Sequence, residues 1–170
     1  LDAKGVLMTK KPTKLPDMPQ NISLVGNHVF THTADLKSTY YQLYDRTTAL
    51  PVWKNPCEVA GAIFFSEITS SGIVYAAQNG GINIVDLTTG LTKLKKDIKT
   101  GPMFQNVSLL DNNQVFFLTS KDMGVADLNT GAYIKEPTKF KKVTQMISSF
   151  DEKNDRLIVR TGTELYFIKT

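Results

Sequence analysis

Histidine and cysteine, the residues that most often bind metals or act in catalysis, are few in this chain, and their spacing suits neither role. The only histidines, His28 and His32, are four residues apart, a spacing that would suit zinc on a helix. Here Asn27-His28 is typical of a hairpin turn and Val29 to Thr33 of a strand. Four residues along a strand span about 13 Å, too far for both histidines to bind one ion even with Asp35 nearby. The acidic run 151–155 lacks the alternating oxygen ligands and the glycine of a calcium loop. We therefore predict no metal site.

Nucleophilic and cofactor chemistry find equally little support. Cys57 is the only cysteine, which excludes an internal disulfide and is typical of a loop or partly buried thiol. The chain has no Gly-x-Ser-x-Gly sequence and no glycine-rich phosphate loop, and Asn79-Gly80-Gly81 is typical of a hairpin turn. We predict no catalytic residues and no cofactor.

A repeat explains the chain better than any of these residues. The sequences Leu1-Asp2-Ala3-Lys4-Gly5, Asp45 to Ala49, Asp86 to Gly90 and Asp127 to Gly131 share one pattern, and their aspartates are 43, 41 and 41 residues apart. A period near forty with one turn per repeat indicates a radial β-repeat. The predicted fold is therefore all-β, a β-propeller of four-stranded antiparallel blades with four repeats of about 41 residues over 1–170.

The shared pattern, Asp-x-x-Thr-Gly, predicts a tight hairpin turn. The aspartate accepts backbone N–H groups two and three residues on, and the glycine supplies a positive φ. The structural turn residues are thus predicted to be Asp45, Thr48, Asp86, Thr89, Gly90, Asp127, Thr130 and Gly131. Because Ala49 replaces glycine and a positive φ costs an L-residue on the order of 1 kcal/mol, we expect the turn at 45–49 to take another form.

Apolar runs and turn residues predict four strands in each repeat. In the second repeat these are 62–65, 73–77, 82–85 and 91–95, and the fourth strands of the first and third repeats are expected at 51–54 and 133–135. The second strands are continuous apolar runs, as expected when both faces are buried. The fourth strands carry lysines, which protect an outermost edge from pairing with other molecules.

The turn sequences resemble those of the PQQ-like (quinoprotein-type) β-propellers. Tyr44-Asp45-Arg46-Thr47-Thr48 followed by Pro51-Val52-Trp53 resembles their tryptophan-docking repeat, and the turns at Asp86 and Asp127 match its core. The resemblance implies a docking role for Trp53, which should be buried near the turn of an adjacent repeat. Leu94 and Lys135 stand where that family usually has tryptophan, which implies a divergent, non-catalytic member. No vicinal cysteine pair, as many quinoprotein dehydrogenases carry, can form.

Such propellers usually have seven or eight blades, whereas this chain supplies four repeats. Either the chain is part of a larger ring or it closes a small one, and its ends have a register that permits closure. We favour the first alternative, in which 1–170 is the C-terminal part of a larger propeller.

Composition excludes several other classes. An apolar fraction of 41% and a charged fraction of 21% are ordinary for a folded domain, and no run of about eighteen apolar residues could span a membrane. The net charge of +4 is mild, and no basic–aromatic motif indicates nucleic acid as a partner.

Rigid blades with variable loops favour recognition over catalysis. The polar segment 33–39 is predicted to be the longest loop within a repeat, and it makes Asp35, Tyr40 and Tyr41 the candidate partner contacts. We expect a non-catalytic scaffold module that binds a protein partner, either the remaining blades of its own propeller or a larger envelope complex. The resemblance implies an extracytoplasmic location, periplasmic or at the cell surface. The alternative is part of a quinoprotein-type dehydrogenase, or another propeller enzyme, whose active site lies outside this segment.

Overall fold

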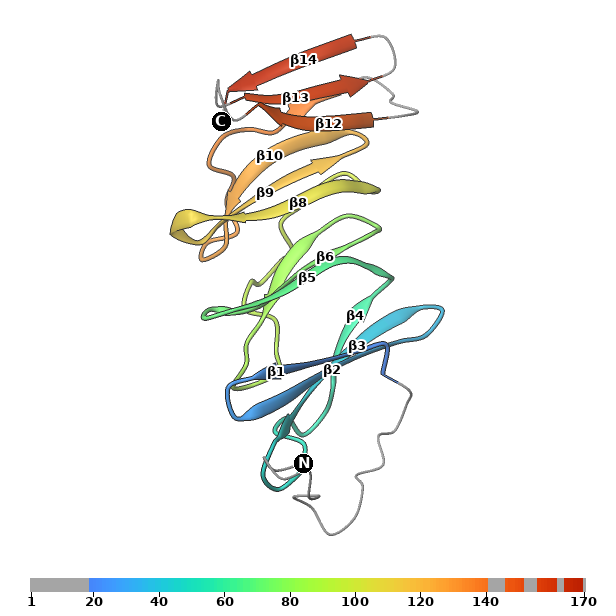
Figure 1. Ribbon diagram of the computed structural model, residues 1–170, viewed down its shortest axis with the longest axis vertical. Helices are drawn as coiled ribbons and strands as arrows, with labels where there is room; N and C mark the ends of the chain where they lie inside the picture. Colours follow the sequence, from blue (N-terminus) through green and yellow to red (C-terminus); the bar gives the residue numbers. More distant parts are fainter. Residues whose placement is uncertain (1–18, 141–145, 152–155, 162–163, 170) are drawn as a thin grey trace. The chain divides into compact units, whose positions relative to one another are not determined.

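A computed structural model describes residues 19–140, 146–151, 156–161 and 164–169 (Figure 1). The first repeat's turn at 1–5, the strand expected at 6–10 and most of the acidic turn 151–155 lie outside these residues. Every described element is a β-strand except a short 3-10 turn, η1, at Asp111–Asn113. The strands are β1 Asn21–Val25, β2 His28–Ala34, β3 Ser38–Asp45, β4 Cys57–Ala60, β5 Ile63–Thr69, β6 Gly72–Ala77, β7 Ile82–Val85, β8 Phe104–Leu110, β9 Gln114–Thr119, β10 Asp122–Asp127, β11 Thr138–Lys139, β12 Met146–Asp151, β13 Arg156–Thr161 and β14 Glu164–Lys169.

The strands pair only with neighbours in sequence, always antiparallel. They form sheets in the orders β1-β2-β3-β4, β5-β6-β7, β11-β10-β9-β8 and β12-β13-β14. Each sheet corresponds to one sequence repeat, so the predicted all-β architecture of consecutive antiparallel units is confirmed.

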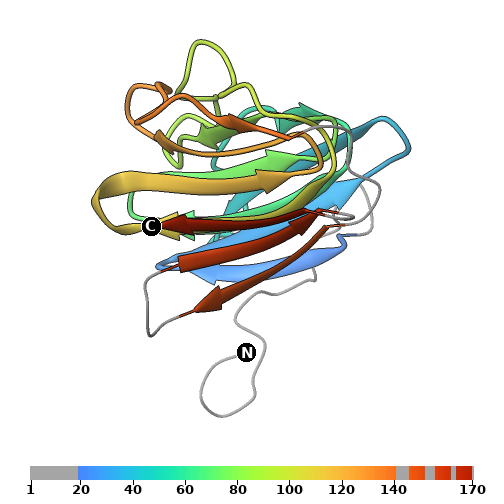
Figure 2. The same cartoon turned by 90° about the horizontal axis from the view of Figure 1, so that it is seen from above.

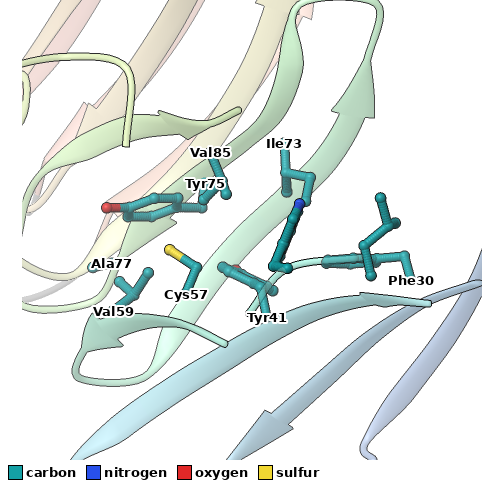
Figure 3. Close-up of a cluster of buried hydrophobic side chains, with 10 residues drawn as sticks. Phe30, Tyr41, Cys57, Val59, Ile73, Tyr75, Ala77 and Val85 are labelled. Carbon is teal, nitrogen blue, oxygen red and sulfur yellow. The ribbon is translucent and has the colours of Figure 1, made fainter. Parts of the chain in front are cut away.

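The chain divides into two compact units. The first ends at Ala77 and adds Ile82–Lys96, and it contains sheets β1–β4 and β5–β7. All six residues of β6 are buried, which explains why this strand is a continuous apolar run. Side chains from both sheets form one core, with Tyr41, Cys57 and Val59 facing Ile73 and Tyr75 (Figure 3).

The second unit contains Gln78–Gly81 and the chain from Asp97 onward, with sheets β8–β11 and β12–β14. The three strands of the last sheet, drawn in red in Figure 2, run antiparallel. Leu118 and Met123 of the first sheet, Phe140 after it and Val159 of the last sheet form its apolar core, and Tyr166 packs against them.

The predicted fourth strands at 51–54, 91–95 and 133–135 are wrong. Each segment makes only a single bridge to the third strand of its repeat, Tyr44 to Pro51, Val85 to Thr92 and Ala126 to Tyr133. The fourth strands observed come later, as β4 and as the two-residue β11, and sheet β5–β7 has none among the described residues. In the first two repeats, side chains take backbone groups that a fourth strand would need: Gln42 Nε2 donates to the Trp53 carbonyl at 3.3 Å, and Asn83 Oδ1 accepts the Leu94 N–H at 3.2 Å.

Candidate functional site

The three aspartate turns have the same geometry. The Oδ1 atom of Asp86 accepts the N–H groups of Thr88 and Thr89, both at 2.9 Å, and the Thr89 hydroxyl at 3.1 Å. The turns at Asp45 and Asp127 repeat this set of bonds at 2.7–3.0 Å. Hydrogen bonds, first of all from the backbone N–H of the threonine, lower the pKa of each carboxyl. These carboxylates hold turns and are not positioned as general bases.

The fifth residue of each turn has a positive φ, 58° at Ala49, 71° at Gly90 and 73° at Gly131. Its N–H donates to the aspartate carbonyl at 2.8–2.9 Å in all three turns. The expectation that Ala49 would force a different turn is therefore wrong. The bonds to Asp45 fix the backbone strongly enough to hold an alanine in this conformation, at a cost on the order of 1 kcal/mol.

Trp53 docks on the second of these turns, within the first unit. Its side chain is 2% exposed, and Nε1–H donates to the Leu87 carbonyl at 2.9 Å. The indole lies directly over Gly90, because a Cβ atom there would be 2.6 Å from Trp53 Cδ2. Gly90 therefore serves two purposes, the positive φ and the space for the ring.

Two buried amides that were not predicted from sequence hold the chain that follows the first and second turns. Gln42 Oε1 accepts the Leu43 N–H at 2.8 Å, and its Nε2 donates to the Trp53 carbonyl at 3.3 Å. Asn83 bonds to Leu94 in the second repeat in the same way. The available signal was an amide residue three positions before Asp45 and before Asp86.

A shallow hollow of about 380 Å³ lies beside the docked indole. It is lined by residues 54–58 and 89–92. Cys57 is buried at its edge, and this burial raises the pKa of the thiol. A raised pKa keeps the thiol protonated at neutral pH, so the hollow offers no activated nucleophile.

The segment 33–39 is not a long loop, contrary to the prediction. Residues 33 and 34 end β2, residues 38 and 39 begin β3, and only Asp35-Leu36-Lys37 connects them. Asp35 Oδ1 accepts the N–H groups of Lys37 and Ser38, both at 2.7 Å, and the Tyr40 hydroxyl donates to Oδ2 at 3.2 Å. The Lys37 carbonyl accepts the Gly61 N–H at 2.7 Å, which ties this hairpin tip to the chain after β4.

The structure separates the three predicted contact residues. Asp35 is exposed and Tyr40 half-exposed at the tip, but Tyr41 is fully buried in the first unit's core. The prediction of Tyr41 as a surface contact is wrong, because successive residues of a strand face opposite sides of the sheet. Leu36, which the prediction passed over, is fully exposed at the tip, where the β2–β3 hairpin ends (Figure 1).

The two histidines lie on one strand, β2. His32 packs against the Tyr41 ring, with 5.4 Å between ring centroids, and burial lowers its pKa. Among the residues that the structure describes, no three His, Cys, Asp or Glu side chains are grouped so that they could hold a metal ion. No helix in the described part of the chain is long and apolar enough to cross a membrane.

Comparison with known proteins identifies the fold. No protein-family model matches the chain, and no curated protein matches it. Among solved structures it is similar to the computationally designed Ika4 protein, with 12% identity, TM-score 0.56, and 91% of this chain and 94% of that chain covered. It is also similar to BamB from Moraxella catarrhalis, with 14% identity, TM-score 0.52, and 84% and 46% covered. The WD40 domain of Toxoplasma gondii coronin gives 12% identity, TM-score 0.51, and 84% and 40% covered.

At these identities the similarities concern the fold alone. Together with the repeated antiparallel sheets, they show a β-propeller-type fold. The chain spans less than half the length of the BamB and coronin chains that it matches.

Proposed function

We propose that this chain is a non-catalytic β-propeller module that binds a protein partner outside the cytoplasm and forms part of a larger ring. The observation that carries the binding role is the β2–β3 tip, which holds a fully exposed leucine on a fixed backbone. An apolar side chain on a backbone fixed in this way gains contact area on binding, and the backbone loses less conformational entropy than a flexible loop would. The extracytoplasmic location is supported by the resemblance to PQQ-like propellers.

The tip has the composition of a small protein-binding epitope. Leu36 supplies the apolar anchor, and the exposed Asp35 and Lys37 flank it with opposite charges. Tyr40 stands beside them and adds an aromatic surface with a polar end. A central apolar group with a polar rim is the usual arrangement of residues that dominate binding energy.

A photo-crosslinking residue at position 36 tests this proposal in cells of the source organism. Position 50 provides the matched control, because Leu50 is also an exposed leucine of the first unit. We expect a distinct cross-linked protein from position 36 only, recovered with the extracytoplasmic fraction. Equal cross-linking from both positions would remove the tip from the proposal, and recovery in the cytosol would refute the location.

The partner identified in this way then permits a quantitative test with purified proteins. Leu36→Asp should weaken binding at least tenfold, whereas Leu50→Asp should leave the dissociation constant unchanged. Unchanged binding by Leu36→Asp would contradict the proposed contact. A quinone or metal ion present in stoichiometric amount in the purified native protein would overturn the non-catalytic role and favour an enzyme.

A further inference from the structure

Met103, the residue just before strand β8, has an unusual backbone conformation. Its φ is 60°, in the left-handed region that glycine adopts freely and that bulky L-residues rarely adopt. The other non-glycine residues with a positive φ in the described part of the chain are Ala49, Asn112 and Asn113. Asparagine tolerates this conformation, and Ala49 is held by the bonds of its aspartate turn. Met103 is therefore the outlier that needs an explanation.

Gly61, about one repeat earlier, shows which residue suits this position. It lies just before β5 and has a φ of 88°. Its N–H donates to the Lys37 carbonyl at 2.7 Å, in the tip of the β2–β3 hairpin. In the same way, the Met103 N–H donates to the Gln78 carbonyl at 3.1 Å, in the β6–β7 hairpin. Glycine would make this backbone link without strain, so the link does not explain why a methionine stands at 103.

Packing within the chain does not explain the methionine either, because its side chain is 62% exposed. Its backbone is nevertheless fixed. The Met103 carbonyl accepts the Ser120 N–H at 3.2 Å and the Gln105 amide at 3.4 Å. The Ser120 hydroxyl also donates to the carbonyl of the preceding residue, Pro102, at 3.1 Å. A strained residue that is held firmly and leaves its side chain in solvent is typical of a functional site.

We propose that Met103 is the second unit's contact with the protein partner, where it meets an aromatic side chain of that partner beside an acidic group that pairs with Lys121. This inference rests on the proposed function. A thioether adapts to apolar surfaces and favours aromatic rings. Lys121 follows Ser120 in the β9–β10 turn, is exposed, and pairs with no carboxylate among the described residues. Leu36 stands next to Lys37, whose carbonyl makes the equivalent link in the first unit, so both exposed apolar side chains belong to the same part of the repeat.

The first test asks whether the methionine is present at the expense of stability. Met103→Gly removes the strain and should raise the folding equilibrium constant of the purified chain about fivefold, measured by urea denaturation. Met103→Gln retains the strain with a polar side chain of similar length and should leave that constant unchanged. A Met103→Gly variant that is no more stable than the unaltered chain would overturn the inference, because the methionine would then need no functional reason.

The second test measures the contact itself. A photo-crosslinking residue at position 103 of the full chain should capture the same protein as one at position 36, identified by mass spectrometry. The same residue at position 110, an exposed leucine at the other end of β8, should not capture it. With that protein purified, Met103→Gly and Met103→Gln should each weaken binding about tenfold, whereas Ala49→Gly, which relieves the same kind of strain, should not change the dissociation constant. Equal capture from positions 103 and 110, or unchanged binding by Met103→Gln, would overturn the inference.

The acidic group of the partner is tested through Lys121. Lys121→Glu should weaken binding, most strongly at low ionic strength, whereas Lys135→Glu, an exposed lysine of the same unit, should not. Equal effects of the two changes would refute the acidic group.

The proposed function and this inference fail separately. Capture of a partner at position 36 alone would refute the contact at Met103 and leave the proposed function standing. Capture at position 103 alone would refute the β2–β3 tip, on which the proposed function rests, and support the contact at Met103.

Discussion

Replacement of Gly90 by alanine should be much more destabilising than the same change at another positive-φ glycine. At Gly90 the new methyl group would meet Trp53 Cδ2 at 2.6 Å and Cγ at 2.7 Å, distances that force the indole to move. Overpacking of this kind costs about 1–3 kcal/mol, and the left-handed backbone adds about 1 kcal/mol. We therefore expect Gly90→Ala to lower the free energy of unfolding by about 3 kcal/mol, measured by urea denaturation.

Two matched variants separate the collision from the backbone strain. Gly26 has a φ of 56° and no atom within 4 Å of the position its Cβ would take, so Gly26→Ala should cost only about 1 kcal/mol. Ala49→Gly removes strain from the first turn and should stabilise by about 0.5–1 kcal/mol. In a Trp53→Ala background the excess cost at Gly90 should disappear. Equal losses for Gly90→Ala and Gly26→Ala would refute the docking of the indole on Gly90.

Two further predictions concern the ionisable groups. Burial alone would raise the pKa of Asp122, but hydrogen bonds from Lys139, Thr119 and the Gly101 N–H outweigh burial and lower it. The stability that this carboxylate contributes is therefore full above about pH 4 and is lost as the pH falls through the lowered pKa. Asp122→Asn should cost about 2 kcal/mol at pH 7 and progressively less toward pH 2, measured by thermal melts. A difference in stability between the two proteins that does not change with pH would contradict this. The buried Cys57 should react with thiol reagents only when the first unit opens. Trp53→Ala should accelerate this reaction, because both side chains belong to one core. Rapid labelling of the unaltered chain would show instead that the thiol is accessible.

The aspartate turns could be predicted from sequence because their backbone demands particular residue types. The turn needs a carboxylate that accepts two backbone N–H groups and a residue that tolerates a positive φ. Few residue types meet these two requirements, so the same pattern recurs at Asp45, Asp86 and Asp127. Ala49 takes the same turn although its positive φ is unfavourable, because the hydrogen bonds to Asp45 offset that cost. The hairpin at Asp35 is similar. Its polar residues are typical of a loop, but Asp35 closes a three-residue turn and the flanking residues extend two strands.

Which side of a strand a residue faces was harder to predict where the pattern does not alternate. Both Tyr40 and Tyr41 are aromatic, and nothing in the sequence distinguishes the exposed ring from the buried one. Register decides it. Tyr41 is paired with His32 and Cys57, on the face that meets β5–β7, and Tyr40 is on the other face.

The segment that follows each turn is held by different side chains in each repeat, and this explains why the fourth strands were mispredicted. In the first repeat Trp53 and Gln42 fix it, and in the second Asn83 bonds to Leu94 directly. The third repeat has Gly124 at the amide position, and there the chain is held further along by the Lys139–Asp122 ion pair at 2.7 Å. The first two repeats share an amide at this position and the third lacks it, so no single residue type marks this part of every repeat. The backbone geometry of the turn restricts the residue types that can form it. The segment after the turn, in contrast, can be held by hydrogen bonds from any of several side chains, and only the structure reveals which side chain makes them.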